Sequence, residues 1–468
     1  MQTDFDIVVI GSGPGGYVAA IRAAQLGFKV AIVERYNILG GTCTVVGCIP
    51  AKALLDASEH YHDIQHKVGK MGISVENLNL DFSRFIERKA GVVKSNSDGV
   101  SYLMRKNKIT TLFGTGSFLN CNQVKITASD GSEKTVTATY FIIATGSKPA
   151  TIPGVEIDKQ RIITSTEALS LKEQPQSIVI IGGGIIGVEM ASVYARIGTK
   201  VTIIEYADIL IPTMDRELGR ELQKVLNKLN IESRLSCRVQ STANKGVQAE
   251  VTYLDAAGVP QTISADLCLV AVGRKPYTTG LGLENTKIGL DERGRIKTDE
   301  RLRTAEVNIF AIGDVVAGVM LAHKAEEEAT FVVESIKGGN PHLNYHTIPS
   351  VVYTWPEVSS VGYTEEQLKE KNIAYRKGKF PFLASGRARA ADDLDGFVKV
   401  LASDRDGEIL GMHIIGARSA DLIQQAVIAM EFEIGDTEMG KICYPHPTYS
   451  EVLKDAFLES CGCGAINI

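Results

Sequence analysis

The sequence predicts an α/β fold with two Rossmann-like dinucleotide-binding domains, followed by an α+β C-terminal domain. Two stretches, which begin near residues 7 and 177, each show an apolar strand, a glycine-rich turn, a helix and a second strand that ends in glutamate. From about residue 345, alternating strands mix with helices and carry no such turn. The chain is long enough for roughly three or four domains, and its hydrophobic content of 44% can fill their cores.

Composition argues against several classes of function. A formal net charge of −5 disfavours nucleic acid or an anionic membrane surface as the main partner. The apolar runs are too short to span a membrane, and the N-terminus enters a strand almost at once, so we expect no membrane segment and no signal or transit peptide. Eight cysteines without regular spacing do not indicate a secreted disulfide framework. We therefore expect a cytoplasmic protein.

The first glycine-rich turn contains Gly11, Gly13 and Gly16 and lies between a strand at residues 7–10 and a helix at residues 17–26. The strand at residues 29–33 then ends at Glu34. Glycines let the backbone approach a pyrophosphate at a helix N-terminus, and the acid accepts hydrogen bonds from ribose hydroxyls. This stretch therefore predicts a dinucleotide site.

Two cysteines, Cys43 and Cys48, follow this unit closely. A helix beginning near Thr42 would place its N-terminal dipole and free N–H groups beside Cys43, which favours a thiolate and a lower thiol pKa. In a regular helix, residues i and i+5 have Cα atoms roughly 8–9 Å apart, whereas a disulfide prefers about 4.4–6.8 Å. A bridge therefore needs a distorted turn, for which Gly47 is the obvious place. An isolated pair with this spacing is more often structural or half of a zinc site, but its position after a dinucleotide signature favours a redox disulfide.

The nucleotide unit recurs with the same spacing. A strand at residues 177–181 leads to a turn with Gly182, Gly184 and Gly187, a helix at residues 188–197, and a strand that ends at Glu205. The first glycine precedes the acid by 23 residues in both copies. Two dinucleotides near one cysteine pair indicate electron transfer from nicotinamide through flavin to a disulfide. The alternative is that one copy is degenerate and empty.

Glu205 also predicts which nicotinamide cofactor binds. A carboxylate at this strand end accepts a hydrogen bond from a ribose 2′-hydroxyl and repels a 2′-phosphate. Residues 206–211 contain no arginine or lysine that could hold that phosphate. The sequence therefore favours NAD over NADP.

The remaining stretches place further elements. Residues 52–112 look helical and polar, and a strand at residues 141–146 ends in a small-residue turn. Residues 147–154 would cross into the second domain, and residues 269–274 would return the chain. A strand at residues 308–314 ends at Asp314, and the helix that follows, from about residue 321 to 336, would direct its N-terminus at a functional site.

One C-terminal stretch contains a candidate catalytic residue. His446 lies between two prolines, which constrain its backbone as a positioned base would require. Thr448 and Glu451, however, have the spacing of a capping box that begins a helix. These residues alone favour a histidine in a surface turn.

Taken together, the motifs resemble one family along the whole chain: GSGPGGYVAA, GGTCTVVGCIPAKALL, ATGS, GGGIIGVEMA, AVGR, FAIGDV, MLAHKAEEEA, IPSVVYTWPEVSSVG and HPTYSE. The chain resembles the pyridine nucleotide–disulfide oxidoreductases, and among them the lipoamide-oxidising enzymes most. The resemblance implies an FAD-binding region at 1–147, an NAD-binding region at 148–274, a central region at 275–345 that completes the FAD site, and a dimer-interface domain at 346–468. It also implies a homodimer.

The same resemblance implies roles for single residues. Cys48 would face the flavin and Cys43 would exchange with substrate, while His446, oriented by Glu451, would act as acid and base on the disulfide of the partner subunit. FAD contacts would come from Gly11, Gly13, Gly16, Glu34, Thr42, Lys52, Gly116, Thr145, Gly146, Asp314 and Ala322. NAD contacts would come from Gly182, Gly184, Gly187, Glu205, Val239 and Gly273. Lys52 and Glu189 would form a pair near the flavin N5, and no metal ligand is implied.

The implied activity is the FAD-dependent oxidation of protein-bound dihydrolipoamide by NAD⁺. Such an enzyme serves 2-oxo acid dehydrogenase complexes or the glycine cleavage system, and its partners are the lipoyl domains of the acyltransferase component. One alternative is an NAD(P)H-driven reductase of another disulfide or of mercuric ion. The other is a structural, metal-binding or scaffolding protein that has lost catalysis.

The chain departs from the family pattern in places. Thr44-Val45 replaces Leu-Asn between the cysteines, Ala51 replaces a serine, and Tyr444-Pro445 replaces His-Ala. None removes a reacting group, but each could shift the energetics of the disulfide or of the histidine. The tail carries Cys461 and Cys463, for which a second redox pair is a further alternative.

Overall fold

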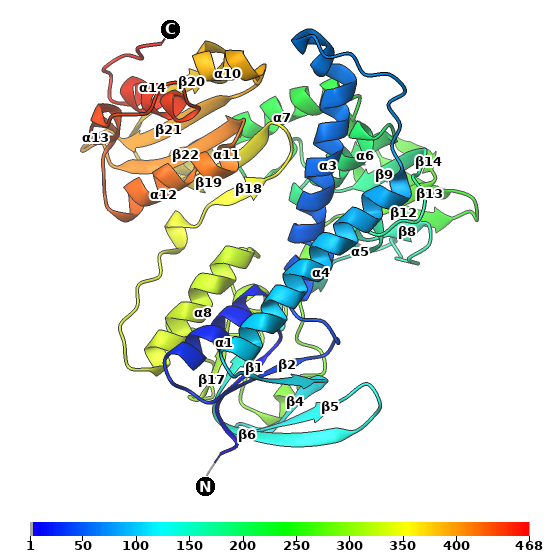
Figure 1. Cartoon of the computed structure of the whole chain (residues 1–468), viewed down its shortest axis with the longest axis vertical. Helices are drawn as coiled ribbons and strands as arrows, with labels where there is room; N and C mark the ends of the chain where they lie inside the picture. The colour runs from blue at the N-terminus through cyan, green and yellow to red at the C-terminus, as the bar shows by residue number, and fades with distance from the viewer. Residues whose placement is uncertain (1–2, 468) are drawn as a thin grey trace. The chain divides into compact units, whose positions relative to one another are not determined.

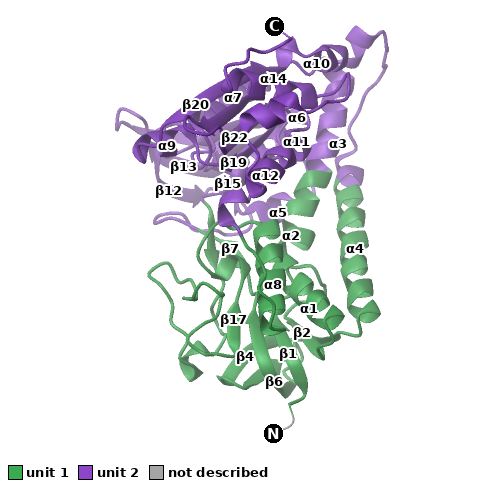
Figure 2. Cartoon of the chain, turned by 90° about the vertical axis from the view of Figure 1, so that its left-hand side faces the viewer, with its two compact units in different colours: residues 1–53, 86–150, 273–343 green, residues 54–85, 151–272, 344–468 purple. Residues whose placement is uncertain are grey.

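The computed structural model describes residues 3–467 and divides the chain into two compact units (Figure 2). Unit 1 comprises the chain up to residue 53, residues 86–150 and residues 273–343. Unit 2 comprises residues 54–85, residues 151–272 and the chain from residue 344. Each unit contains one of the two predicted glycine-rich turns.

Unit 1 is built on a seven-stranded sheet. Its order is β3 (Thr110–Phe113), β2 (Val30–Glu34), β1 (Phe5–Ile10), β6 (Glu133–Ile143), β5 (Gln123–Thr127) and β4 (Thr115–Asn120), with β17 (Ile309–Ala311) also paired to β6. The pairings of β1 with β2 and β6 are parallel. Helices α1 (Pro14–Gln25) and α8 (Ala322–Ile336) lie side by side (Figure 1). Gly15 permits this packing, because a Cβ there would lie 3.0 Å from the Ala325 carbonyl oxygen.

Unit 2 contains a second parallel sheet and two antiparallel ones. The parallel sheet has the order β11 (Glu232–Arg234), β10 (Lys200–Ile204), β9 (Ser177–Ile181), β15 (Leu267–Val270) and β8 (Ile162–Ile163), and α6 (Ile185–Arg196) connects β9 to β10. An antiparallel meander follows, with β12 (Arg238–Asn244), β13 (Ala249–Leu254) and β14 (Pro260–Ala265). The two Rossmann-like parallel sheets, one in each unit, and a separate C-terminal sheet confirm the predicted α/β class.

The C-terminal sheet is antiparallel. Its order is β18 (Ser350–Val352), β19 (Glu357–Gly362), β22 (Ile409–Gly416), β21 (Phe397–Ser403) and β20 (Tyr375–Pro381), and α14 (Ser450–Ser460) packs on β20 and β21. Unit 2 also contains α5 (Ser165–Ala168), α7 (Arg216–Lys228), α9 (Glu365–Glu370), α10 (Gly386–Ala391), α11 (Ser419–Leu422), α12 (Gln424–Glu431), α13 (Asp436–Lys441) and most of α3 (Cys48–His66).

The two predicted crossings pair with each other. Strands β7 (Ser147–Pro149) and β16 (Arg274–Pro276) are antiparallel, and the Ala150 N–H donates to the Gly273 carbonyl over 2.9 Å. The outgoing and returning segments therefore form one small ribbon within unit 1.

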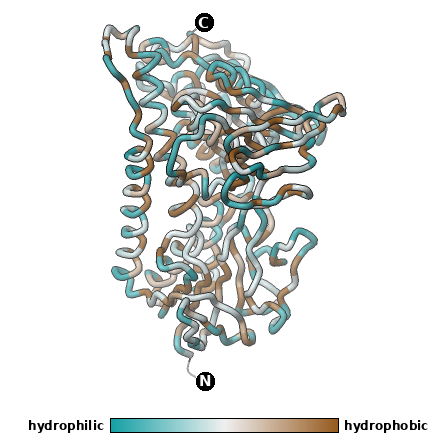
Figure 3. Tube along the Cα trace, turned by 90° about the vertical axis from the view of Figure 1, so that its right-hand side faces the viewer, coloured by the Kyte–Doolittle hydropathy of each residue, from teal (hydrophilic) through white to brown (hydrophobic). Residues whose placement is uncertain are grey.

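Residues 52–112 are largely helical, as predicted, but the helix is interrupted and does not extend to the end of this stretch. Helix α3 (Cys48–His66) and helix α4 (Phe82–Lys106) are separated by a 3₁₀ turn at Val68–Met71 and a loop, and β3 follows α4. Gly72 ends the turn in a left-handed conformation with φ of +80°, and Asp81 accepts a hydrogen bond from the Arg84 N–H where α4 begins. In Figure 3 the long helices alternate hydrophobic and hydrophilic residues along their turns, as partly exposed helices do. No helix within residues 3–467 has the length and apolar character needed to cross a membrane.

Candidate active site

The first glycine-rich turn has close backbone contacts that only glycine permits. A Cβ on Gly11, whose φ is +105°, would lie 2.4 Å from the Ala144 carbonyl oxygen, and a Cβ on Gly16 would lie 1.9 Å from the Gly11 carbonyl oxygen. Gly13 is the N-cap of α1, and the first turn of that helix carries no acidic side chain. The N-terminal N–H groups of α1 are therefore suited to bind a phosphate.

The second turn repeats these contacts. A Cβ on Gly182 would lie 2.5 Å from the Ala271 carbonyl oxygen, and a Cβ on Gly187 would lie 1.9 Å from the Gly182 carbonyl oxygen. Gly184 is the N-cap of α6, as Gly13 is of α1. The two turns are thus alike in structure as well as in sequence, because equivalent glycines approach equivalent carbonyl oxygens.

The two strand-end acids are also held alike. Glu34 accepts hydrogen bonds from the Ser12 N–H at 3.1 Å, the Ser12 hydroxyl at 2.6 Å and the Tyr36 N–H at 3.0 Å. Glu205 accepts from the Gly183 N–H at 2.5 Å and the Ala207 N–H at 2.7 Å. Each carboxylate is therefore fixed beside its turn, where a ribose would lie.

Two arginines that follow Glu205 in the chain have side-chain partners of their own. Arg216 forms an ion pair with Asp208 at 2.5 Å. Arg234, whose carbonyl accepts the Glu205 N–H, directs its side chain to Glu232 at 2.9 Å and to the Tyr253 hydroxyl. Both guanidinium groups thus have partners other than a 2′-phosphate.

Gly47 breaks the helix between the two cysteines, as the disulfide geometry predicted. Helix α2 (Gly41–Val46) ends before it and α3 begins at Cys48, while Gly47 has φ of −141° and ψ of −112°. A Cβ on Gly47 would lie 2.8 Å from the Thr42 carbonyl oxygen and 3.4 Å from the Cys43 Cα. Only glycine therefore allows the start of α3 to approach the first turn of α2.

Residues 40–48, the cysteine segment, also pack against the first glycine-rich turn. A Cβ on Gly41, whose φ is +60°, would lie 2.5 Å from the Gly13 Cα. The Gly40 N–H donates to the Ser12 carbonyl over 3.1 Å. The fold thus holds the thiols next to the turn that is suited to a pyrophosphate.

Cys43 and Cys48 are unbridged thiols here, Cys43 partly buried and Cys48 exposed. The predicted lowering of the Cys43 pKa is wrong for this dithiol state. The hydrogen bond with Cys48 raises the pKa of Cys43, and burial adds to this, whereas Lys52 acts in the opposite direction. In this state the hydrogen bond between the two thiols and the burial of Cys43 keep the pKa of Cys43 raised.

Asp314, expected at the end of a strand, lies in a 3₁₀ turn at Gly313–Val315 that follows β17. Its carboxylate accepts from the Ser147 hydroxyl at 2.5 Å, and that hydroxyl accepts from Arg274 Nε at 2.7 Å. Behind the turn, the fully buried Lys324 and Glu328 form an ion pair at 2.7 Å. The two residues also bind the Gly313 carbonyl and N–H, at 3.1 and 2.7 Å, so they fix the turn. Their spacing of four on a helix was the available signal.

The other predicted cofactor residues fall in both units. In unit 1, Gly116 lies in β4, Lys52 lies in α3, and Ala322 is the first residue of α8. The Thr145 hydroxyl donates to the Tyr277 carbonyl at 2.7 Å. Gly146 and Gly273 both have positive φ. In unit 2, Val239 lies buried in β12, and Glu189 lies buried in α6, where its carboxylate accepts from the Tyr353 N–H at 2.9 Å. The pairing of Lys52 with Glu189 stays a prediction.

His446 and Glu451 interact directly. His446 Nδ1 lies 2.8 Å from Glu451 Oε1, and Glu451 Oε2 accepts the Thr448 N–H at 2.9 Å. Burial raises the pKa of Glu451, but the Thr448 N–H and His446 outweigh it and leave that pKa below its usual value. With Nδ1–H donated to Glu451, Nε2 of the exposed ring can accept a proton.

The predicted capping box forms only in part. The Glu451 side chain bonds the Thr448 N–H, but the Thr448 hydroxyl donates to the Pro445 carbonyl at 2.8 Å instead of capping the helix. Helix α14 begins at Ser450, with Tyr449 as its N-cap. Glu451 therefore serves the turn with one oxygen and the histidine with the other.

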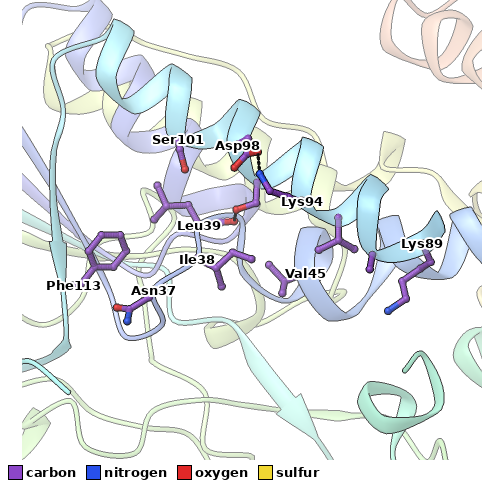
Figure 4. A pocket seen from close by; sticks show the side chains of 12 residues that line it. Asn37, Ile38, Leu39, Val45, Lys89, Lys94, Asp98, Ser101 and Phe113 are labelled. Carbon is purple, nitrogen blue, oxygen red and sulfur yellow. Dashed lines mark hydrogen bonds and ion pairs between the residues drawn. The ribbon is translucent and has the colours of Figure 1, made fainter. Parts of the chain in front are cut away.

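A pocket of about 390 Å³ lies beside the cysteine segment in unit 1 (Figure 4). Ile38, Leu39 and Val45 line it together with residues of α4, and Lys94 and Asp98 form an ion pair there at 2.5 Å. None of the predicted site residues is among the residues that line it.

Glu59, His62 and Asp63 on α3 place possible metal-ligand atoms within 4.8 Å of one another. Arg196 Nη2 lies 2.6 Å from Glu59 Oε2, and Lys67 Nζ lies 2.9 Å from Asp63 Oδ1. Both carboxylates are thus already balanced by cations, which accounts for the cluster as an ion-pair network.

Known proteins resemble the chain over nearly its full length. The mitochondrial dihydrolipoyl dehydrogenase of Pisum sativum is 44% identical over 97% of this chain and 91% of its own. The dihydrolipoamide dehydrogenase of Chaetomium thermophilum is 45% identical, over 98% and 92%. Among solved structures, the HOCl-induced flavoprotein disulfide reductase RclA of Escherichia coli has a TM-score of 0.85 at 28% identity, covering 97% of this chain and 99% of its own.

The expected cytoplasmic location is wrong by these comparisons. The relatives from Pisum sativum, Dictyostelium discoideum and Caenorhabditis elegans are described as mitochondrial. They point to a mitochondrial rather than a cytoplasmic location. An early strand and a modest net charge do not distinguish these compartments.

Two family models cover most of the chain. The pyridine nucleotide-disulphide oxidoreductase model matches residues 5–329, and the dimerisation domain of the same family matches residues 348–457. The repeated nucleotide turns and the adjacent thiol pair agree with these matches. The chain therefore belongs to the pyridine nucleotide-disulphide oxidoreductase family.

Proposed function

We propose that this chain oxidises dihydrolipoamide with NAD⁺ through a redox disulfide between Cys43 and Cys48. The observation that carries the proposal is the Gly47 break, which brings both thiols together on a segment docked against the first nucleotide turn. Relatives named dihydrolipoyl dehydrogenase, at 43–45% identity over nearly the whole chain, support the substrate. FAD and NAD are the cofactors of this family.

The residues present fit both cofactors. FAD would be held by the Gly11 turn, Glu34 and the Asp314 turn, and NAD by the Gly182 turn and Glu205. Bound FAD supplies two-electron transfer between the thiols and NAD⁺. Cys48 would face FAD, and Cys43, the more buried thiol, would exchange with substrate.

The thiol chemistry follows from the groups described. His446 Nε2 takes the proton from the first thiol of dihydrolipoamide, and Glu451 stabilises the imidazolium that forms. The substrate thiolate attacks Cys43 Sγ and breaks the bond to Cys48, which leaves as a thiolate. The second substrate thiol then attacks the substrate sulfur of the mixed disulfide, and Cys43 leaves with the proton of that thiol. The substrate closes to its cyclic disulfide, so two electrons have reached the cysteine pair.

The assembly proposed is a homodimer in which His446 acts on the cysteine pair of the partner subunit. The match to the family's dimerisation domain supports the dimer. The finer division into regions 1–147, 148–274, 275–345 and 346–468 belongs to this proposal, as do lipoyl domains of an acyltransferase component as partners.

A panel of substrates tests the proposal. Steady-state turnover should be high with dihydrolipoamide and NAD⁺ and low with NADPH and either glutathione disulfide or oxidised thioredoxin. The second candidate, an NAD(P)H-driven reductase of another disulfide, is favoured by the likeness to the flavoprotein disulfide reductase RclA at 28% identity. Faster turnover of either of these disulfides with NADPH would establish that candidate instead.

A further inference from the structure

We infer that Asp393 and Tyr449 are positioning residues for the His446–Glu451 pair, an inference that rests on the proposed role of His446. The Tyr449 hydroxyl donates to Asp393 Oδ2 over 2.6 Å. The other carboxylate oxygen, Oδ1, accepts from Trp355 Nε1 over 3.2 Å. One carboxylate thus joins the segment before β19 to the residue that precedes α14.

Tyr449 links the Asp393 carboxylate to His446, the candidate base, through the first turn of α14. It is the N-cap residue of α14, and Glu451 lies in the first turn of that helix. The direction in which Glu451 leaves α14 therefore depends on how Tyr449 is held. Because Glu451 binds both His446 Nδ1 and the Thr448 N–H, a small rotation of the first turn would weaken both bonds.

The surroundings hold Tyr449 in one orientation. Its ring centroid lies 6.2 Å from that of Phe382, and the Arg387 guanidinium lies 5.5 Å from the centroid. Asp393 is fixed through its own backbone, because its N–H donates to the Ala388 carbonyl over 3.0 Å. His446 itself is exposed, so its orientation relies on this partly buried support more than on packing around its ring.

The test is Tyr449→Phe, which removes one hydroxyl and keeps the ring. In the FAD-loaded enzyme we expect kcat for dihydrolipoamide oxidation to fall by roughly three- to thirtyfold, less than the loss of a direct base. The KM for dihydrolipoamide and the transfer of electrons from NADH to a dye should stay within about twofold, since neither needs the base. Asp393→Asn should lower the same kcat, and the double variant should be no slower than the slower single variant, because both changes break one interaction.

Tyr375→Phe is the matched control. Its hydroxyl donates to the Glu365 carboxylate over 2.8 Å, a bond of the same kind on β20. This variant should show the wild-type kcat. An unchanged kcat in Tyr449→Phe, or an equal fall in Tyr375→Phe, would overturn the inference. If His446→Ala itself leaves dihydrolipoamide turnover intact, the proposed function of His446 fails first, and the two failures are thereby distinguished.

Discussion

His446 Nδ1 lies 2.8 Å from Glu451 Oε1, while the second oxygen of Glu451 holds the Thr448 N–H. A single carboxylate therefore orients the ring and closes the turn that carries it. The sequence left open whether Glu451 orients the histidine or caps the turn. The two roles are compatible, because each uses a different carboxylate oxygen.

His446→Ala should lower dihydrolipoamide turnover by roughly 10²–10⁴, the usual size of a lost general acid or base. FAD content and electron transfer from NADH to a dye should be nearly unchanged, because they do not use the histidine. Steady-state kinetics with both electron acceptors make this measurement. Equal losses in the two assays would indicate a structural role.

Glu451→Gln should cost less activity than His446→Ala, because an amide oxygen can still bind the ring but provides no charge. Glu451→Ala removes both hydrogen bonds and should also destabilise the fold by about 1 kcal/mol. Thermal denaturation and dihydrolipoamide turnover are measured on the same samples. Loss of stability with full activity would leave Glu451 only its role in the turn.

A mixed dimer tests whether His446 acts across the interface. One subunit carries Cys43→Ser and the other His446→Ala. If the histidine serves the partner subunit, one of the two sites is intact and about half of the activity survives. Action within a subunit would leave both sites broken, so an inactive mixed dimer rules out the proposed arrangement.

Glu205→Arg should narrow the preference for NAD⁺ over NADP⁺. In the unaltered enzyme kcat/KM should favour NAD⁺ by well over tenfold, since an unmatched charge beside the 2′-phosphate costs more than about 1.4 kcal/mol. Glu205 is buried and bonded to the Gly183 N–H, so the carboxylate is already in place. Comparable rates with the two cofactors in the unaltered enzyme would contradict this account.

Gly47→Ala should impair the cysteine pair. Its Cβ would lie 2.8 Å from the Thr42 carbonyl oxygen, so the two helices must move apart, at a cost of about 1–3 kcal/mol in unfolding free energy. Dihydrolipoamide turnover should fall with it. Gly91→Ala in α4, where a Cβ meets nothing within 4 Å, is the control and should stabilise by up to about 1 kcal/mol. Equal effects of both changes would remove the special role of Gly47.

The sequence predicted what depends on local pattern. Glycine spacing and terminal acids located both nucleotide turns, and disulfide geometry located the break at Gly47. The crossings at β7 and β16 followed from a proline-containing stretch and a mirrored apolar strand. All of these features are encoded by residues close together in the chain.

What the sequence missed depends on contacts between distant residues. Lys324 and Glu328 have the spacing of a surface ion pair, and only the packed fold buries them against the Gly313 turn. Burial along β12 does not alternate, so its pattern could not reveal a strand. The pKa of Cys43 is raised and not lowered, because the largest influence on it is the hydrogen bond with Cys48, across the Gly47 break.

The most direct test is anaerobic reduction of the oxidised, FAD-loaded enzyme by dihydrolipoamide, with the new thiols located by alkylation and mass spectrometry. We predict that one equivalent per subunit produces two new thiols, at Cys43 and Cys48, and that added NAD⁺ removes both and yields one NADH. New thiols at other cysteines, or NADH formed while Cys43 and Cys48 never become thiols, would contradict the proposed route of the electrons.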